Sequence, residues 1–169
     1  MFFCFKNLIK IFVVFLICVK TPVAQNIFIE NKGQFDNKVI AKVNLPGGAL
    51  FIQEGQLYYA FYSQKKLDSI HNLLTQSRNI HTHAYSVEFV NSNTDVKTFL
   101  IDSSNYYENY FLGPKEKWST NVKTFKTLRQ ENIYKGIDIL FYSYNDNLKY
   151  DILVKSGANI NNVKLKYEG

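Results

Sequence analysis

The stretch that says most about the fold is Ile137-Asp138-Ile139-Leu140-Phe141-Tyr142, then a polar turn over residues 143–147, then Leu148-Lys149-Tyr150-Asp151-Ile152-Leu153-Val154. Two runs rich in β-branched and aromatic residues that flank a short polar segment are typical of a β-hairpin. Asparagine, which tolerates the backbone of tight turns, occurs in that segment. A five-residue loop pairs Leu140 with Tyr150, and this register predicts that Asp138 and Asp151 point to opposite faces of the sheet.

A second hairpin is predicted earlier in the chain. Residues 49–53 and 56–62 alternate and flank Glu54-Gly55, a two-residue connection suited to a tight turn. Pairing Ile52 with Leu57 leaves apolar side chains on both faces. This hairpin is therefore either covered on both sides or presents an aromatic surface.

The remaining pattern is that of short strands separated by turns. Leu67, Ile70 and Leu74 have helical spacing, so residues 65–76 are the one candidate helix, although no capping box precedes them. Strands with turn signals at short spacing predict an all-β fold, an antiparallel β-sandwich or barrel-like sheet of about seven to nine short strands with at most one short helix. Further strands are expected at residues 81–90, 96–101, 122–129 and 163–167.

The first twenty-four residues have the layout of a secretory signal. Lys6 and Lys10 precede the uninterrupted apolar run 11–19, and a polar, helix-breaking stretch ends at the small residue Ala24. Nine apolar residues span about 14 Å as a helix, too short for the ~30 Å hydrocarbon core of a membrane. Cleavage is expected after Ala24, which leaves residues 25–169 as a single domain without a transmembrane span.

Removal of this segment changes what the composition implies. Both cysteines, Cys4 and Cys18, leave with it, which excludes disulfides and thiolate metal sites in the mature domain. The net charge falls from +6 to +3, because three lysines and no acidic residue are lost. Nucleic-acid binding requires a clustered basic face, and none is visible, so no nucleic-acid partner is expected.

Catalytic and metal-binding motifs are not found. His81 and His83 would lie on one side of a strand, a usable start for a zinc site, but a third ligand is not apparent. Asp138 and Asp151 cannot act on one glycosidic bond if they face opposite ways. Pro46-Gly47-Gly48 lacks the Lys-Ser/Thr of a phosphate loop and is interpreted as a turn. The sequence therefore predicts no catalytic residues, no metal and no cofactor.

Aromatic side chains are the remaining candidates for a binding site. Exposed aromatic rings stack on the faces of sugars and anchor protein interfaces. In a small β domain such rings are more often part of the core, and the sequence leaves both interpretations open. The candidate ligand-binding residues are Tyr58, Tyr62, Tyr106, Tyr107, Tyr110 and Trp118.

Several motifs resemble a known family as a set. They are residues 29–35 (Ile-Glu-Asn-Lys-Gly-Gln-Phe), Trp118 with the following Thr120-Asn121-Val122, residues 132–142 (Asn-Ile-Tyr-Lys-Gly-Ile-Asp-Ile-Leu-Phe-Tyr) with 148–151 (Leu-Lys-Tyr-Asp), and Gly157-Ala158. Over residues 26–169 the chain resembles the N-terminal domain of unknown function of secreted bacterial surface proteins with SBBP-type propeller repeats. Many such proteins end in a type IX secretion sorting domain or a gliding-motility-associated domain.

The resemblance implies location and role but no catalytic residues. It implies an exported β-rich module at the cell surface or outside the cell, with the periplasm as an alternative, and the N-terminal part of a longer protein. Its expected partners are the C-terminal repeats or domains of that protein, and glycans or other surface proteins. A non-catalytic structural or interaction module is the leading hypothesis, and a carbohydrate-binding adhesin is the alternative.

Overall fold

The computed structural model of the chain describes residues 28–72, 79–145 and 147–169. The predicted signal and its cleavage site after Ala24 lie outside these residues. So does the part of the candidate helix beyond residue 72.

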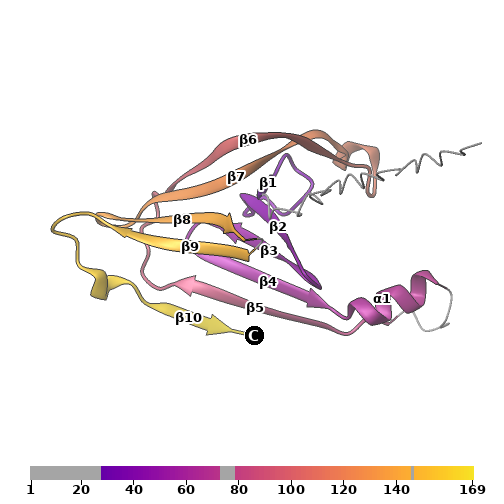
Figure 1. Cartoon of the computed structure of the whole chain (residues 1–169), viewed down its shortest axis with the longest axis horizontal. Coiled ribbons are helices and arrows are strands. Elements are labelled where there is room, and N and C mark those ends of the chain that lie inside the picture. The colour runs from indigo at the N-terminus through magenta and orange to yellow at the C-terminus, as the bar shows by residue number, and fades with distance from the viewer. Residues whose placement is uncertain (1–27, 73–78, 146) are drawn as a thin grey trace, which may run out of the picture.

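The described chain is almost entirely antiparallel β-structure, as predicted (Figure 1). It has ten strands, two of them much longer than the sequence indicated, because β6 and β7 run for 14 and 16 residues. The elements are β1 Phe28–Glu30, β2 Ala41–Leu45, β3 Gly48–Gln53, β4 Gln56–Tyr62, α1 Gln64–His71, β5 Thr82–Phe89, β6 Lys97–Tyr110, η1 Lys115–Lys117, β7 Ser119–Tyr134, β8 Ile137–Tyr144, β9 Asn147–Val154, η2 Ile160–Asn162 and β10 Leu165–Glu168.

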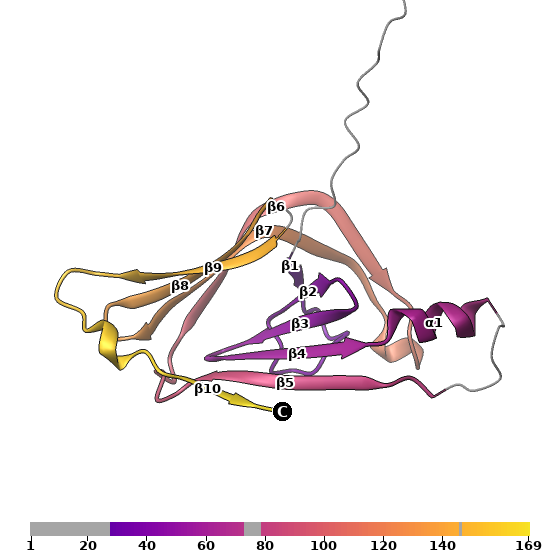
Figure 2. The same ribbon diagram turned by 60° about the horizontal axis from the view of Figure 1, so that its bottom comes forward.

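The strands form one curled sheet in the order β10-β5-β4-β3-β2-β1-β7-β8-β9, and β6 pairs with β7. The long strand β7 makes the curl possible, because different parts of one edge pair with different strands. Thr124 and Phe125 pair with β1, and the stretch from Thr127 to Tyr134 pairs with β8. The β8–β9 hairpin thereby folds over the β3–β5 part of the sheet, giving a half-barrel (Figure 2).

The hydrophobic core fills the inside of this curl, and the side of the sheet that faces it is here named the inner face. The core forms because alternate residues of each strand point toward the inner face. The predicted β3–β4 register, Ile52 opposite Leu57, is confirmed, and both side chains are buried. The buried core consists of Phe28, Ala41, Val43, Leu50, Ile52, Leu57, Val87, Phe89, Val96, Leu128, Ile133, Tyr134, Ile137, Ile139 and Phe141.

The predicted register of the β8–β9 hairpin is wrong by one residue. Tyr144 pairs with Asn147, so the connection has two residues rather than five, and Asn145 takes a φ of 47°, the left-handed conformation that such turns require. A slip of one residue moves every side chain of a strand to the other face. Leu140 is opposite Asp151 and Asp138 is opposite Leu153, so the two carboxylates share the outer face.

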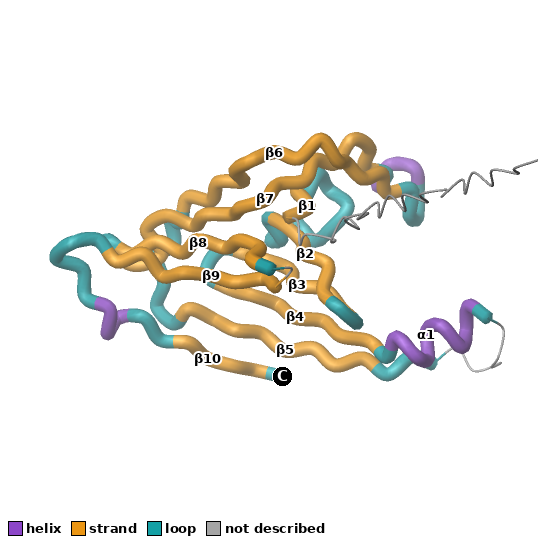
Figure 3. Tube along the Cα trace, in the orientation of Figure 1, coloured by secondary structure: helices purple, strands orange, loops and turns teal. Residues whose placement is uncertain are grey.

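The helix lies beside the sheet and covers neither of its faces (Figure 3). No residue of α1 is buried. The Ser63 hydroxyl accepts a hydrogen bond from the Lys66 N–H, which caps the first turn without a capping box. It is the only α-helix within the described ranges, in agreement with the expected single short helix.

Candidate functional site

The motif at residues 132–138 closes the β7–β8 hairpin around the buried carboxylate of Asp138. A bulge interrupts the pairing between Gln130 and Tyr134, and Asn132 adopts a φ of 59° within it. The Asn132 N–H donates to Asp138 Oδ1 at 2.8 Å. Arg129 Nη2 donates to Oδ2 at 2.7 Å, and Lys155 Nζ lies 3.3 Å from Oδ2. The Asp138 side chain is 1% exposed.

These partners keep Asp138 ionised. Burial alone would raise the pKa of this carboxyl, but the hydrogen bonds from the Asn132 N–H, Arg129 and Lys155 outweigh burial and lower the pKa below its ordinary value. A general acid of a glycosidase needs the opposite, a raised pKa. Asp151, on the same face, is exposed and accepts a hydrogen bond from the Tyr142 hydroxyl at 3.2 Å.

The rest of the motif contacts the loop that follows β5 and the loop that follows β9. Tyr134 is 5% exposed, and its hydroxyl donates to the Val90 carbonyl oxygen at 2.9 Å. Asn93 Nδ2 donates to the Asn132 carbonyl oxygen at 2.7 Å. A Cβ on Gly136, which has a φ of 72°, would lie 3.0 Å from the Ala158 Cβ. Residues 132–138 and Gly157-Ala158 thus hold the fold together.

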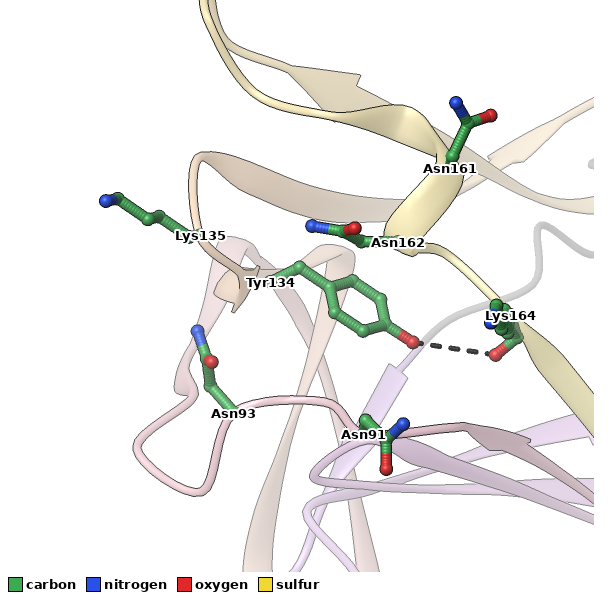
Figure 4. A pocket seen from close by; sticks show the side chains of 7 residues that line it. All are labelled: Asn91, Asn93, Tyr134, Lys135, Asn161, Asn162 and Lys164. Carbon is green, nitrogen blue, oxygen red and sulfur yellow. Dashed lines mark hydrogen bonds between the residues drawn. The ribbon is translucent and has the colours of Figure 1, made fainter.

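A polar depression of about 310 Å³ opens beside this junction (Figure 4). The Tyr134 ring crosses its centre, with the hydroxyl directed at the Lys164 carbonyl oxygen. The depression presents carboxamides and two lysine side chains, donors suited to an anionic ligand. Its lining residues are Asn91, Asn93, Tyr134, Lys135, Asn161, Asn162 and Lys164.

The six predicted aromatic residues are dispersed rather than gathered into one platform. Tyr106 and Tyr107 lie in β6 and are 57% and 54% exposed. Trp118 packs edge-on against Phe111, with ring centroids 5.2 Å apart, and its Nε1–H donates to the Gly113 carbonyl oxygen. Among the described residues, no ring contact joins Trp118 to the other five.

Tyr110 takes part in a different set of contacts, on the outer face. Its ring packs edge-on against Phe35 at 5.4 Å, and Phe35 packs in the same way against Phe51 at 5.8 Å. The Tyr110 hydroxyl donates to Glu108, and burial together with this hydrogen bond raises the pKa of Tyr110. Lys42 lies over the Phe35 ring, and burial lowers the pKa of its ammonium group, an effect that Glu108 opposes.

Tyr58 and Tyr62 also lie on the outer face, on β4. Each is 40% exposed, but they differ in surroundings. Tyr58 is opposite Phe51 and lines a depression with Phe35, whereas Tyr62 lies at the end of the strand. Of the six candidates, Tyr58 and Tyr110 are thus connected, through Phe35 and Phe51.

A second aromatic cluster lies on the inner face, and none of its members was among the candidate binding residues. Tyr59, Phe61 and Tyr85 stack in layers, with Tyr59 and Tyr85 centroids 4.7 Å apart. Burial, then the nearby Tyr85, Tyr150 and Tyr167, raises the pKa of Tyr59 to about 12. This inner-face cluster therefore lies close to Tyr150 on β9 and Tyr167 on β10, which are 41% and 66% exposed.

The two strands beside this cluster end the sheet. In the described part of the chain, β9 pairs only with β8, and β10 pairs only with β5. An edge strand presents a row of unpaired N–H and C=O groups and can pair with another polypeptide. The half-barrel does not close, because β9 and β10 do not pair with each other in the described chain (Figure 2). Tyr150 and Tyr167, on these two strands, are partly exposed.

The histidines do not form a metal site with neighbours in the described residues. His83 is exposed and lies against the Tyr85 ring at 6.0 Å. No group of three or more His, Cys, Asp and Glu side chains that could hold a metal ion occurs across residues 28–72, 79–145 and 147–169. Over the same residues, none of the helices has the length and apolar character to cross a membrane.

The strands of the described chain, joined into one curled sheet, define an all-β module. Comparison with known protein families assigns residues 28–169 to a domain of unknown function, DUF7948. The chain belongs to this family, and the match spans all of the described residues. No curated protein and no solved structure matches the chain.

Proposed function

We propose that this protein is a non-catalytic exported module, a structural or interaction domain of a larger secreted or cell-surface protein. The observation that carries the proposal is the opening of the half-barrel between β9 and β10. There, two unpaired strand edges flank exposed apolar rings, among them Tyr150 and Tyr167. A polypeptide segment that adds a strand would pair with the edge backbone and cover the rings.

The state of the acidic residues supports a non-catalytic role. Asp138 is ionised, buried and fully occupied by Asn132, Arg129 and Lys155. Asp151, its neighbour on the outer face, has an ordinary exposed setting. Because the pKa of Asp138 is lowered and its oxygens are taken up by these partners, this carboxyl is unsuited to act as a general acid for hydrolysis.

The partner proposed for the open edges is a segment of the longer protein, from its C-terminal repeats or domains. The motifs at residues 29–35 and 132–142, which resemble the N-terminal domain of SBBP-repeat proteins, support this choice. By the same resemblance, type IX secretion or a role in gliding motility is proposed for that longer protein. The location proposed is the cell surface or the extracellular medium, with the periplasm as the alternative.

Export is tested at the N-terminus. We expect the mature protein to begin at Gln25, because the apolar run 11–19 and Ala24 form a signal that a signal peptidase removes. N-terminal sequencing or intact mass of the protein recovered from its producing cells measures this. A protein that retains residues 1–24 after export would contradict the proposed signal.

Strand addition is tested by hydrogen exchange. We expect amides at the free edges of β9 and β10 to exchange at least about tenfold more slowly in the protein purified from its cell surface than in residues 25–169 alone, since pairing protects them. Mass spectrometry of peptic peptides measures both samples. The internal control is β8, which pairs with β7 and β9 and should change little. Equal exchange of β9 and β10 in the two samples would rule out a covering strand.

A further inference from the structure

The outer face carries a trough between residues 35–40 and the β3–β4 hairpin. One part of the trough, about 350 Å³, is lined by aromatic and aliphatic side chains, among them Phe35, Phe51 and Tyr58. The adjoining part, about 320 Å³, is lined by polar groups and Ile40. Gln53 lines both parts. The complete lining is Phe35, Asp36, Val39, Phe51, Gln53 and Tyr58 on the apolar side, with Asn37, Lys38, Ile40 and Glu54 on the polar side.

The wall of this trough is held in place before any ligand binds. Asn31 Nδ2 donates to the carbonyl oxygens of Asp36 and Val39, at 2.7 and 2.8 Å. The Val39 N–H donates to the Asp36 carbonyl oxygen at 3.0 Å, and Val39 is 7% exposed. Phe35 packs edge-on against Phe51. A preformed wall lowers the entropic cost of binding.

Several polar side chains along the trough have no hydrogen-bond partner in the described part of the chain. Across the described residues, no hydrogen bond is made by the Tyr58 hydroxyl, the Gln53 and Asn37 carboxamides or the Glu54 carboxylate. Asp36 Oδ1 accepts a hydrogen bond from the Lys38 N–H at 2.9 Å. The trough therefore combines an exposed aromatic ring with uncommitted donors and acceptors.

A ligand that fits the trough must be apolar on one face and polar on the other. The charged residues of the lining then decide which ligands of this kind are favoured. Asp36, Glu54 and Lys38 give the lining a formal charge of −1, which disfavours phosphates, nucleic acids and acidic sugars. Pyranose rings present an apolar C–H face for stacking and hydroxyls that pair with carboxamides and carboxylates. We propose that the trough binds a neutral saccharide, with one ring on Tyr58 and hydroxyls at Gln53, Asn37 and Glu54.

This site is independent of strand addition, because Phe51 and Tyr58 lie on the outer face and the open edges flank the inner face. It also places the sugar on a different set of residues from the one that the sequence indicated. Of the six candidates only Tyr58 is retained, and Phe35 and Phe51 take the place of the other five, Tyr62, Tyr106, Tyr107, Tyr110 and Trp118.

The test is a glycan array of neutral and acidic saccharides probed with the mature protein, followed by calorimetric titration of the strongest neutral hit. We expect Tyr58→Ala to weaken binding at least about tenfold, equivalent to about 1.4 kcal/mol. The matched control is Tyr62→Ala, on the same strand and face with the same exposure but outside the trough. It should leave affinity unchanged. Thermal unfolding of both variants verifies that they fold.

A second variant tests the polar half. Gln53→Ala removes the carboxamide shared by both parts of the trough and leaves the backbone oxygen that Gln130 Nε2 contacts, so we expect about a fivefold to tenfold loss of affinity. Three results overturn the proposal. They are an array on which no neutral saccharide is retained, binding confined to acidic saccharides, and binding that survives Tyr58→Ala or is lost equally in Tyr62→Ala.

Discussion

Replacing Asp138 by alanine is expected to lower the free energy of unfolding by about 3 kcal/mol, since it removes the buried carboxylate on which one backbone N–H and two cations converge. The Asn132 N–H loses its acceptor within the bulge, Lys155 loses its counter-ion, and Arg129 keeps Glu131, with the Arg129 Nε 3.4 Å from the Glu131 carboxylate. Both cations are partly exposed, so water can hydrate them, which places the loss at the low end of the range for buried pairs. Urea unfolding at neutral pH measures the difference.

Asp151→Ala is the matched control, on the neighbouring strand and the same face. Its carboxylate is exposed and has one long hydrogen bond, from Tyr142, so we expect a change within about 0.5 kcal/mol. Equal losses for the two variants would contradict the anchoring role of Asp138.

The same carboxylate gives a stability component that depends on pH. Its pKa is lowered in the folded protein, so this component is complete above the pKa of the unfolded chain, about 3.9, and is lost as pH falls through the folded pKa. In Asp138→Asn that acid-dependent component should be absent. Its unfolding free energy should therefore fall less between neutral and acid pH than that of the natural protein. A parallel fall in both proteins would show that other groups dominate.

Local sequence patterns were sufficient to predict a turn where a single glycine determines its backbone conformation. Glu54-Gly55 between two alternating runs predicted the β3–β4 hairpin and its register, because Gly55 supplies the positive φ of 65° that a two-residue turn requires. The turn interpreted at Pro46-Gly47-Gly48 connects β2 and β3 through Pro46 and Gly47, while Gly48 begins β3. The all-β class also follows from alternation.

The predicted strand register was wrong where the length of the turn was ambiguous. Residues 143–147 were interpreted as a five-residue loop because they are all polar or turn-forming, yet Ser143, Tyr144 and Asn147 extend the strands. The short β1 and β2 were missed since three and five residues carry too little alternation. Nothing local indicated that β7 pairs with two different strands along one edge, which is what curls the sheet.

Residue type alone was not sufficient to predict which aromatic side chains lie together in the candidate site. The density of aromatic residues pointed to Tyr106, Tyr107, Tyr110 and Trp118, but a binding platform requires neighbouring side chains that only the strand order provides. Phe35 packs edge-on against Phe51, a contact between positions 16 residues apart in the chain that depends on the fold of residues 31–40. The motif at residues 29–35 was the available signal for it.

Gly48→Ala is expected to cost about 2–4 kcal/mol, more than most single substitutions, because a side chain there meets backbone. A Cβ on Gly48 would lie 2.3 Å from the Ala60 carbonyl oxygen and 2.8 Å from Phe61 Cδ1. Neither the strand pairing nor the Phe61 ring can stay in place. Because Phe61 stacks on Tyr59 and Tyr85, we expect the near-ultraviolet circular dichroism of the aromatic rings to change together with stability.

The adjacent Gly47→Ala separates this clash from simple backbone strain. Gly47 has a φ of 71°, and the nearest atom to its Cβ position, the Tyr62 carbonyl oxygen, is 3.7 Å away. Its cost should be only that of the left-handed conformation, about 1–2 kcal/mol, with the aromatic spectrum unchanged. If Gly48→Ala were no more costly than Gly47→Ala, the close pairing of Gly48 with Phe61 would be wrong. The inner-face cluster would then need a different packing, because that pairing sets the position of the Phe61 ring against Tyr59 and Tyr85.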